Sequence, residues 1–141
     1  MNPDFKSCLE KKRILPFPKG KFLVEKELQT AEEDLNDAKF GFAHNRYKWS
    51  TIQGYYSMFH SARALLFSKG YREKSHYCLF IALNDLFVKE GKLDVEYIEA
   101  FRNAMTLREN ADYRTRFSKS GAEAVIENAE AFLNTARKII K

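Results

Sequence analysis

The sequence predicts an all-α fold, namely an antiparallel bundle of four to five helices with short connections. Apolar residues recur every three or four positions along most of the chain, and this spacing places them on one face of a helix. No segment alternates apolar and polar residues in the way that is typical of strands. The chain has 141 residues, of which 45% are hydrophobic, so it can bury the core of one domain.

The first 20 residues are the irregular part of the chain. The segment from Leu15 to Gly20, with the sequence LPFPKG, contains two prolines and a glycine and should turn or extend. A short helix over residues 5–14 can precede it. We therefore divide the chain into an N-terminal extension, residues 1–20, and a helical bundle domain, residues 21–141.

The first two bundle helices are predicted from their apolar faces. Residues 21–44 carry one apolar stripe, made up of Val24, Leu28, Ala31, Leu35, Ala38 and Phe42. The second helix should begin at Ser50, because Ser50 and Gln53 have the spacing of a capping box, and it should end at Gly70. It is apolar around more than half its girth, so we expect it to be central or to form a dimer interface.

Three further helices complete the predicted bundle. The third covers residues 75–90 and ends at Gly91. Asp94 can cap the fourth helix, whose inward stripe is Ile98, Phe101, Met105 and Arg108. The fifth should open at Ser120, because Ser120 and Glu123 again have the spacing of a capping box.

The charge, the hydropathy and the cysteine positions indicate which kinds of partner and bound group to expect. A formal net charge of +5 permits a polyanionic partner without requiring one. No apolar run approaches the ~20 residues that cross a bilayer, and charges interrupt the N-terminus, so we expect a soluble cytoplasmic protein without a membrane partner. Cys8 and Cys78 lack CxxC and zinc spacings. We therefore expect no metal site, no cofactor and no disulfide, with Cys78 as a small buried hydrophobe.

Arg108 is the first candidate functional residue, because it continues the apolar stripe of the fourth helix. Its guanidinium keeps its charge, and burying it without a partner is very costly. It must therefore meet a carboxylate, a dimer partner or a ligand anion. Asp112 on the same helix, or a carboxylate on another helix, would make its role structural.

Other polar residues fall on predicted helices and leave two interpretations open. His60 lies on the apolar face of the second helix, where it is either a core histidine or a catalytic base, and Arg63 can point to the same groove. Lys74, Ser75 and His76 precede or open the third helix, where they could bind a phosphate. Alternatively, Ser75 is a plain helix cap.

Polar aromatic residues are numerous for a small bundle and include Tyr47, Trp49, Tyr55, Tyr56, Tyr71, Tyr77 and Tyr113. Exposed rings of this kind can stack nucleic-acid bases. Aromatic residues at helical spacing more often belong to the core, and we take that as the default.

Two segments together resemble the HEPN superfamily (higher eukaryotes and prokaryotes nucleotide-binding domain), specifically its small stand-alone prokaryotic and archaeal branch. One is GYYSMFHSARALLFSKGYREKSH, from Gly54 to His76, and the other is LRENADY, from Leu107 to Tyr113. The resemblance covers most of residues 21–141. It implies a helical bundle that forms a homodimer and acts with a minimal nucleotidyltransferase, often as a toxin–antitoxin pair.

Active members of this superfamily are metal-independent endoribonucleases with an arginine, four to six residues and then a histidine on the fourth helix. Arg108 matches the arginine, but Tyr113 stands at the histidine position. A tyrosine is a poor base at neutral pH, because its reference pKa is about 10 against about 6.5 for histidine. Asp112 could pair with Arg108 and hold it in place.

Three functional hypotheses follow. The first is a homodimeric binding module for a nucleotide or RNA that acts with a minimal nucleotidyltransferase and carries a degenerate ribonuclease motif. The second is an active endoribonuclease toxin, in which Arg108 stabilises phosphate charge, Tyr113 assists, and His60 or His76 supplies the base. The third is a structural or regulatory helical partner that does not contact nucleic acid.

Overall fold

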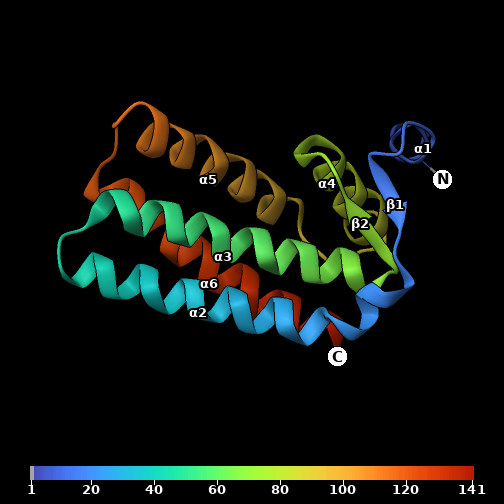
Figure 1. Cartoon of the computed structure of the whole chain (residues 1–141), viewed down its shortest axis with the longest axis horizontal. Helices are drawn as coiled ribbons and strands as arrows, with labels where there is room; N and C mark the ends of the chain where they lie inside the picture. The colour runs from blue at the N-terminus through green and yellow to red at the C-terminus, as the bar shows by residue number, and fades with distance from the viewer. Residues whose placement is uncertain (1) are drawn as a thin grey trace.

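The computed structural model describes residues 2–141, and these form an antiparallel helical bundle with a small two-stranded sheet at one end (Figure 1). The elements in chain order are α1 (Pro3–Glu10), β1 (Ile14–Pro16), the 3-10 helix η1 (Pro18–Phe22), α2 (Val24–Ala43), α3 (Tyr47–Ser68), β2 (Tyr71–Glu73), α4 (His76–Leu83), the π-helical turn η2 (Asn84–Val88), α5 (Val95–Tyr113) and α6 (Lys119–Ile140). The predicted all-α class is therefore confirmed.

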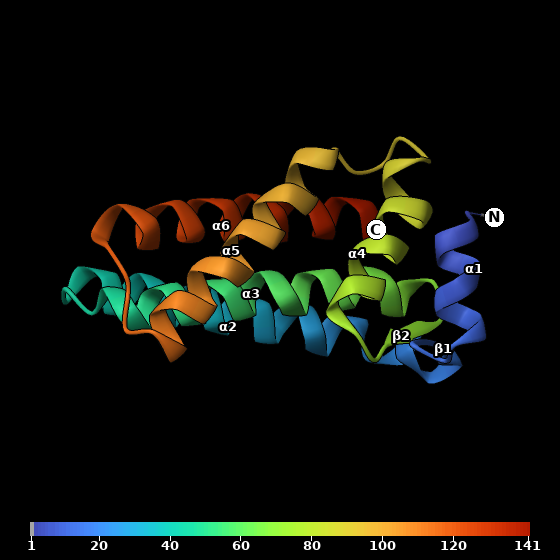
Figure 2. The same ribbon diagram turned by 90° about the horizontal axis from the view of Figure 1, so that it is seen from above.

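The helix α3 lies at the centre of the bundle, between α2 and α5 and in front of α6 in Figure 1. More than half of its residues are buried, which agrees with the apolar girth seen in its sequence. Gly54 lets α3 and α6 approach closely, because a Cβ atom at this position would lie 2.8 Å from Cγ1 of Val125. Figure 2 shows the same arrangement from above, with α6 and α2 on opposite sides of α3 and α5 crossing obliquely over α3.

The predicted helix limits are correct where a glycine or an aspartate sets them. Gly70 and Gly91 have positive φ angles of 80° and 71° after α3 and η2, a conformation that glycine adopts without steric cost. Asp94 caps α5 by accepting the backbone N–H of Glu96. The apolar stripe predicted for α2 is buried from Val24 to Ala38.

Two predicted helix starts are wrong. The helix α3 begins at Tyr47, and Ser50 lies within it, where its hydroxyl donates to the carbonyl of Arg46 at 2.9 Å. In α6 the capping residue is Ser118, whose hydroxyl accepts the N–H of Gly121, so the helix begins two residues earlier than Ser120 would set it. In neither case does the predicted serine make the capping hydrogen bond, because a serine can also bond to nearby backbone groups from inside a helix.

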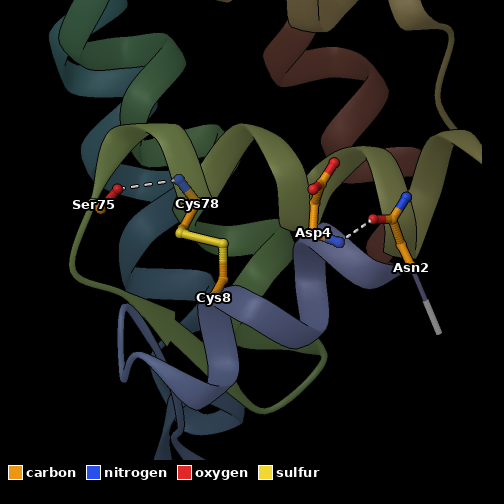
Figure 3. The surroundings of a disulfide bond; sticks show 5 residues. All are labelled: Asn2, Asp4, Cys8, Ser75 and Cys78. Carbon is orange, nitrogen blue, oxygen red and sulfur yellow. Dashed lines mark hydrogen bonds between the residues drawn. A yellow bond between two sulfur atoms is a disulfide. The ribbon is translucent and has the colours of Figure 1, made fainter.

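The N-terminal segment is held to the bundle by a strand pair and a disulfide. β1 pairs antiparallel with β2, so that Ile14 lies opposite Glu73. Our expectation of two unpaired cysteines is wrong, because Cys8 of α1 and Cys78 of α4 form a disulfide with their Cα atoms 5.8 Å apart (Figure 3). Both cysteines are buried and lie 70 residues apart in sequence, so their pairing requires α1 and α4 to pack together. Cys78 therefore crosslinks the fold, besides packing in the core.

Among the helices of residues 2–141, none combines the length and the apolarity that crossing a bilayer requires.

Candidate functional site

Arg108 lies in the fifth helix, α5, within a cluster of tyrosine rings. Its Nη2 donates to the hydroxyl of Tyr56 at 2.8 Å and lies 3.3 Å from Oδ2 of Asp112. Its Cζ lies 5.7, 5.3 and 5.2 Å from the ring centroids of Tyr55, Tyr56 and Tyr113, respectively. Such distances allow cation–π attraction, which favours this position of the guanidinium against α3. We call these five residues the Arg108 cluster.

The cluster shows how an arginine can occupy the inward stripe of α5. Its side chain keeps 16% of its surface exposed, so it is largely removed from water. The pairing with Asp112, one turn ahead on the same helix, is the structural alternative raised by the sequence. The Nε of Arg108 is buried and has no acceptor among residues 2–141. A buried polar group without a partner is costly and is seldom retained without a reason.

Tyr55 lies beneath this arginine and is itself almost fully buried. Burial raises the pKa of its hydroxyl well above the ordinary value, although the nearby charge of Arg108 opposes the effect. The Tyr55 hydroxyl therefore stays protonated and acts as a hydrogen-bonding group. It lies 3.1 Å from Nδ1 of His76.

His76 opens α4 and reaches toward the Arg108 cluster. Its Nδ1 also lies 3.2 Å from Sδ of Met105, and its ring stacks at 5.5 Å from that of Phe59. Ser75 accepts the N–H of Cys78 at 3.2 Å and so caps α4, as the plain-cap alternative expected. The neighbouring Lys74 is exposed.

His60 lies one turn after Tyr56 on α3, and its ring contacts carboxylates of α2. Its Nδ1 is 2.6 Å from Oε2 of Glu27, and its Nε2 is 3.8 Å from Oδ2 of Asp34. Burial raises the pKa of Asp34 above its ordinary value, and the proximity of His60 only partly offsets this. The hydrogen bond to Glu27 links α3 to α2, so the structure gives His60 a structural partner.

Arg63 is one turn further along α3 and is fully engaged. It donates from Nε and Nη2 to the two carboxylate oxygens of Glu73 at 3.2 and 2.8 Å. Burial alone would lower the pKa of Arg63, but the hydrogen bond and charge of Glu73 outweigh burial and raise it. This bidentate pair attaches β2 to α3, so the structure gives Arg63 a structural partner.

Sequence reasoning found Arg108, Asp112 and Tyr113 but missed the partners on other elements. Tyr56 was among the aromatic residues assigned to the core by default, although its hydroxyl is the nearest acceptor for Arg108. Glu73 and Glu27, which contact Arg63 and His60, lie 10 and 33 residues away from them. No local pattern in the sequence indicates these partners.

Comparisons with known proteins agree with this architecture. A family model described as "HEPN domain" matches residues 24–140. A protein of Methanocaldococcus jannaschii named "Putative toxin MJ0605" is 33% identical over 84% of this chain and 89% of its own length. "Putative toxin MJ0142" of the same organism is 30% identical over 83% of this chain and 81% of its own length. A "UPF0332 protein" of Thermotoga maritima is 30% identical over 84% of this chain and 92% of its own length.

A solved structure supports the fold alone. The crystal structure of TT1696 from Thermus thermophilus superposes with a TM-score of 0.71 at 14% identity, covering 83% of this chain and 98% of that one. The family model covers both segments that carried the sequence resemblance and all four long helices of the bundle. The chain therefore belongs to the HEPN domain family.

Proposed function

We propose that this protein is a HEPN-domain member of a toxin–antitoxin-type system that binds RNA or a nucleotide as a homodimer and acts with a minimal nucleotidyltransferase. The names of the two Methanocaldococcus relatives support a toxin–antitoxin context. The observation that carries the binding role is the Arg108 cluster, a permanent cation with unused donors beside several aromatic rings.

The chemistry of the cluster suits a phosphate with an attached base. A guanidinium presents five N–H donors in one plane, and only Nη2 of Arg108 makes an observed hydrogen bond or ion pair. Its Nη1 donors remain for an anion, whereas Nε is buried. A phosphate would compete with Asp112, whose side chain is 30% exposed and can swing toward solvent.

Tyr113 favours binding over cleavage. Its side chain is 70% exposed at the end of α5, so it can reorient toward a ligand. A phenol can donate a hydrogen bond to a phosphate oxygen or orient a 2′-hydroxyl, but it is a poor general base at neutral pH. The cluster therefore has a residue for holding RNA at the position where active relatives carry their proton acceptor.

One observation favours a second candidate, a metal-independent endoribonuclease. His76 is exposed and lies 3.1 Å from the hydroxyl of Tyr55, whose ring also contacts Arg108, so the two residues share a neighbour. In this alternative His76 serves as the base and Arg108 stabilises charge that develops on the phosphate. His60 is less suited to this task, because its Nδ1 already pairs with Glu27 and Asp34 lies 3.8 Å from its Nε2.

The experiment that tests both candidates follows RNA retention and cleavage in the presence of a chelator. It compares wild type with Arg108→Ala and His76→Ala, and uses Arg102→Ala as a matched control, because Arg102 is an exposed arginine on the same helix. RNA retention that is lost only in Arg108→Ala supports the binding module. Cleavage that requires both Arg108 and His76 supports the ribonuclease.

Equal retention by wild type and Arg108→Ala would refute a role of this cluster in RNA binding. No retention of RNA by wild type would instead leave the third hypothesis, a structural or regulatory partner without nucleic-acid contact. Sedimentation of wild type and Arg108→Glu tests the dimer separately: we expect a dimer that weakens in the variant, and a monomer in wild type would contradict the proposal.

A further inference from the structure

One end of the bundle is formed by two connections that are distant in sequence. The turn between α2 and α3 and the connection between α5 and α6 lie together at the left end of the molecule in both ribbon views (Figures 1 and 2). Lys39 and Phe42 of α2 line the same hollow as Lys119 and Glu123 of α6, which places the two connections side by side. We call residues 39–49 and 113–119 the aromatic–basic end.

The net positive charge of the chain is concentrated at this end. The two segments contain six basic residues, Lys39, Arg46, Lys48, Arg114, Arg116 and Lys119, and no Asp or Glu. The whole chain has a formal net charge of +5, so all other residues together carry −1. Lys39 is paired with Glu130 at 2.8 Å, and Arg114 donates to Asn110 at 2.8 Å. Residues 113–120 are all exposed, so this charge is open to a polyanion.

Exposed aromatic rings accompany this charge. Phe40, Trp49, Tyr113 and Phe117 are 66%, 52%, 70% and 49% exposed, respectively. They are four of the six aromatic residues found exposed within residues 2–141, and the other two, Phe22 and Tyr77, lie outside these segments. Rings interspersed with cations are typical of surfaces that bind single-stranded nucleic acid, because each base presents a flat face for stacking.

The rings lead toward the Arg108 cluster along α3. Phe40, Arg46 and Trp49 line an open hollow of about 230 Å³ together with Asp37, Gly41 and Gln53. Seven residues separate Trp49 from Tyr56, so the two lie on one face of α3 about 10 Å apart along its axis. Tyr56 in turn binds Arg108. A strand that stacks on Trp49 can therefore continue to the cluster.

We propose that the aromatic–basic end is the docking surface for single-stranded RNA, with bases on Trp49, Phe40, Tyr113 and Phe117 and phosphates on Arg46, Arg114, Arg116 and Lys119. This inference rests on the proposed function, because it names the form of nucleic acid that reaches the Arg108 cluster. An acidic protein would use the same charges, but it would not need four rings. Duplex RNA should bind less well, because its bases are already stacked.

Trp49 is the single tryptophan of the chain, so its fluorescence reports directly on this surface. The probe is a short oligouridylate, used alone and as a duplex with its complement, with binding followed by anisotropy and by Trp49 emission. We expect quenching by the single strand and weaker binding of the duplex. Trp49→Ala should lower single-strand affinity about tenfold, since one stacked base contributes roughly that much.

Charge variants test the phosphate contacts. In Arg114→Gln/Arg116→Gln the slope of log affinity against log salt should become shallower by about 1.4, since each phosphate contact to a single strand contributes about 0.7. The matched control is Lys19→Gln/Lys21→Gln, which removes the same charge from exposed residues at the opposite end of the bundle. The control should bind like wild type.

The outcomes separate this inference from the proposed function. Loss of binding in the end variants while the control binds normally supports the surface. Normal binding by the end variants without quenching, together with loss in Arg108→Ala, refutes the surface and leaves the proposed function intact. Normal binding by Arg108→Ala together with loss of binding in the end variants supports the surface and refutes the role of the Arg108 cluster in the proposed function. Absence of any RNA binding overturns both the surface and the proposed RNA-binding function. Quenching of Trp49 by an acidic protein but not by RNA overturns the surface as an RNA site.

Discussion

Removing the disulfide between Cys8 and Cys78 should destabilise the protein substantially. The bond links α1 to α4 and closes a loop with a sequence separation of 70 residues, which contains both α2 and α3. A crosslink of this kind stabilises mainly by restricting the unfolded chain, and the effect grows with the logarithm of loop length. The double variant Cys8→Ala/Cys78→Ala removes the crosslink without leaving a free thiol.

The magnitude follows from the loop length. The chain-entropy relation gives about 4 kcal/mol for a loop of this size, and measured native disulfides contribute about 2–4 kcal/mol. The two sulfur atoms are also buried, so the alanine variant loses some packing in addition. For a domain of 141 residues we therefore expect a fall in Tm on the order of 10 °C.

Urea unfolding of four samples measures this effect: wild type and the double variant, each with and without reductant. Reductant should lower the stability of wild type to a value near that of the variant and should leave the variant unchanged. Alkylation of denatured, unreduced wild type should find no free thiol. Two free thiols, or a wild type whose unfolding is insensitive to reductant, would refute the reasoning.

Three further predictions concern packing and charge within the bundle. Gly54→Ala should lower the unfolding free energy by about 1–2 kcal/mol, because its Cβ would lie 2.8 Å from the Cγ1 atom of Val125, and a double-mutant cycle with Val125→Ala should show that the two losses are not additive. Arg63→Ala should cost about 3 kcal/mol in urea unfolding, because it leaves the buried carboxylate of Glu73 without its partner, whereas Arg63→Leu/Glu73→Leu should cost less. Burial raises the folded-state pKa of Asp34, so the native state binds more protons than the unfolded state and ionisation of Asp34 opposes folding as pH rises. Asp34→Asn should therefore melt higher than wild type at pH 7, with the difference disappearing below the ordinary aspartate pKa of about 3.9.

The parts of the fold that follow from local spacing were predictable from the sequence. The buried stripe of α2 and the glycines that end α3 and η2 depend on residues within one or two turns of each other. The parts that depend on tertiary proximity were not. Ile14 pairs with Glu73 in strands of only three residues, which are too short for an alternating pattern to appear.

The same distinction applies to the candidate site. Arg108 stood out because a charge on an apolar stripe is unusual, and Asp112 was found because it lies one turn away on the same helix. The contact with Tyr56 spans 52 residues, and the contact between Tyr55 and His76 spans 21. No local pattern selects one tyrosine among seven for such a contact.

Tyr113 contributes to the position of the Arg108 guanidinium but is poorly suited to accept a proton. Three tyrosine rings, the hydroxyl of Tyr56 and the carboxylate of Asp112 surround Arg108. A tyrosine is a poor proton acceptor near neutral pH, and the carboxylate of Asp112 is already paired with the arginine. The cluster thus positions the guanidinium of Arg108 but contains no unpaired group that would accept a proton at neutral pH. An imidazole that could complete it comes from α4, whose first turn carries both His76 and the disulfide-bonded Cys78. The N-terminal segment therefore stabilises the helix on which any catalytic role of this site would depend.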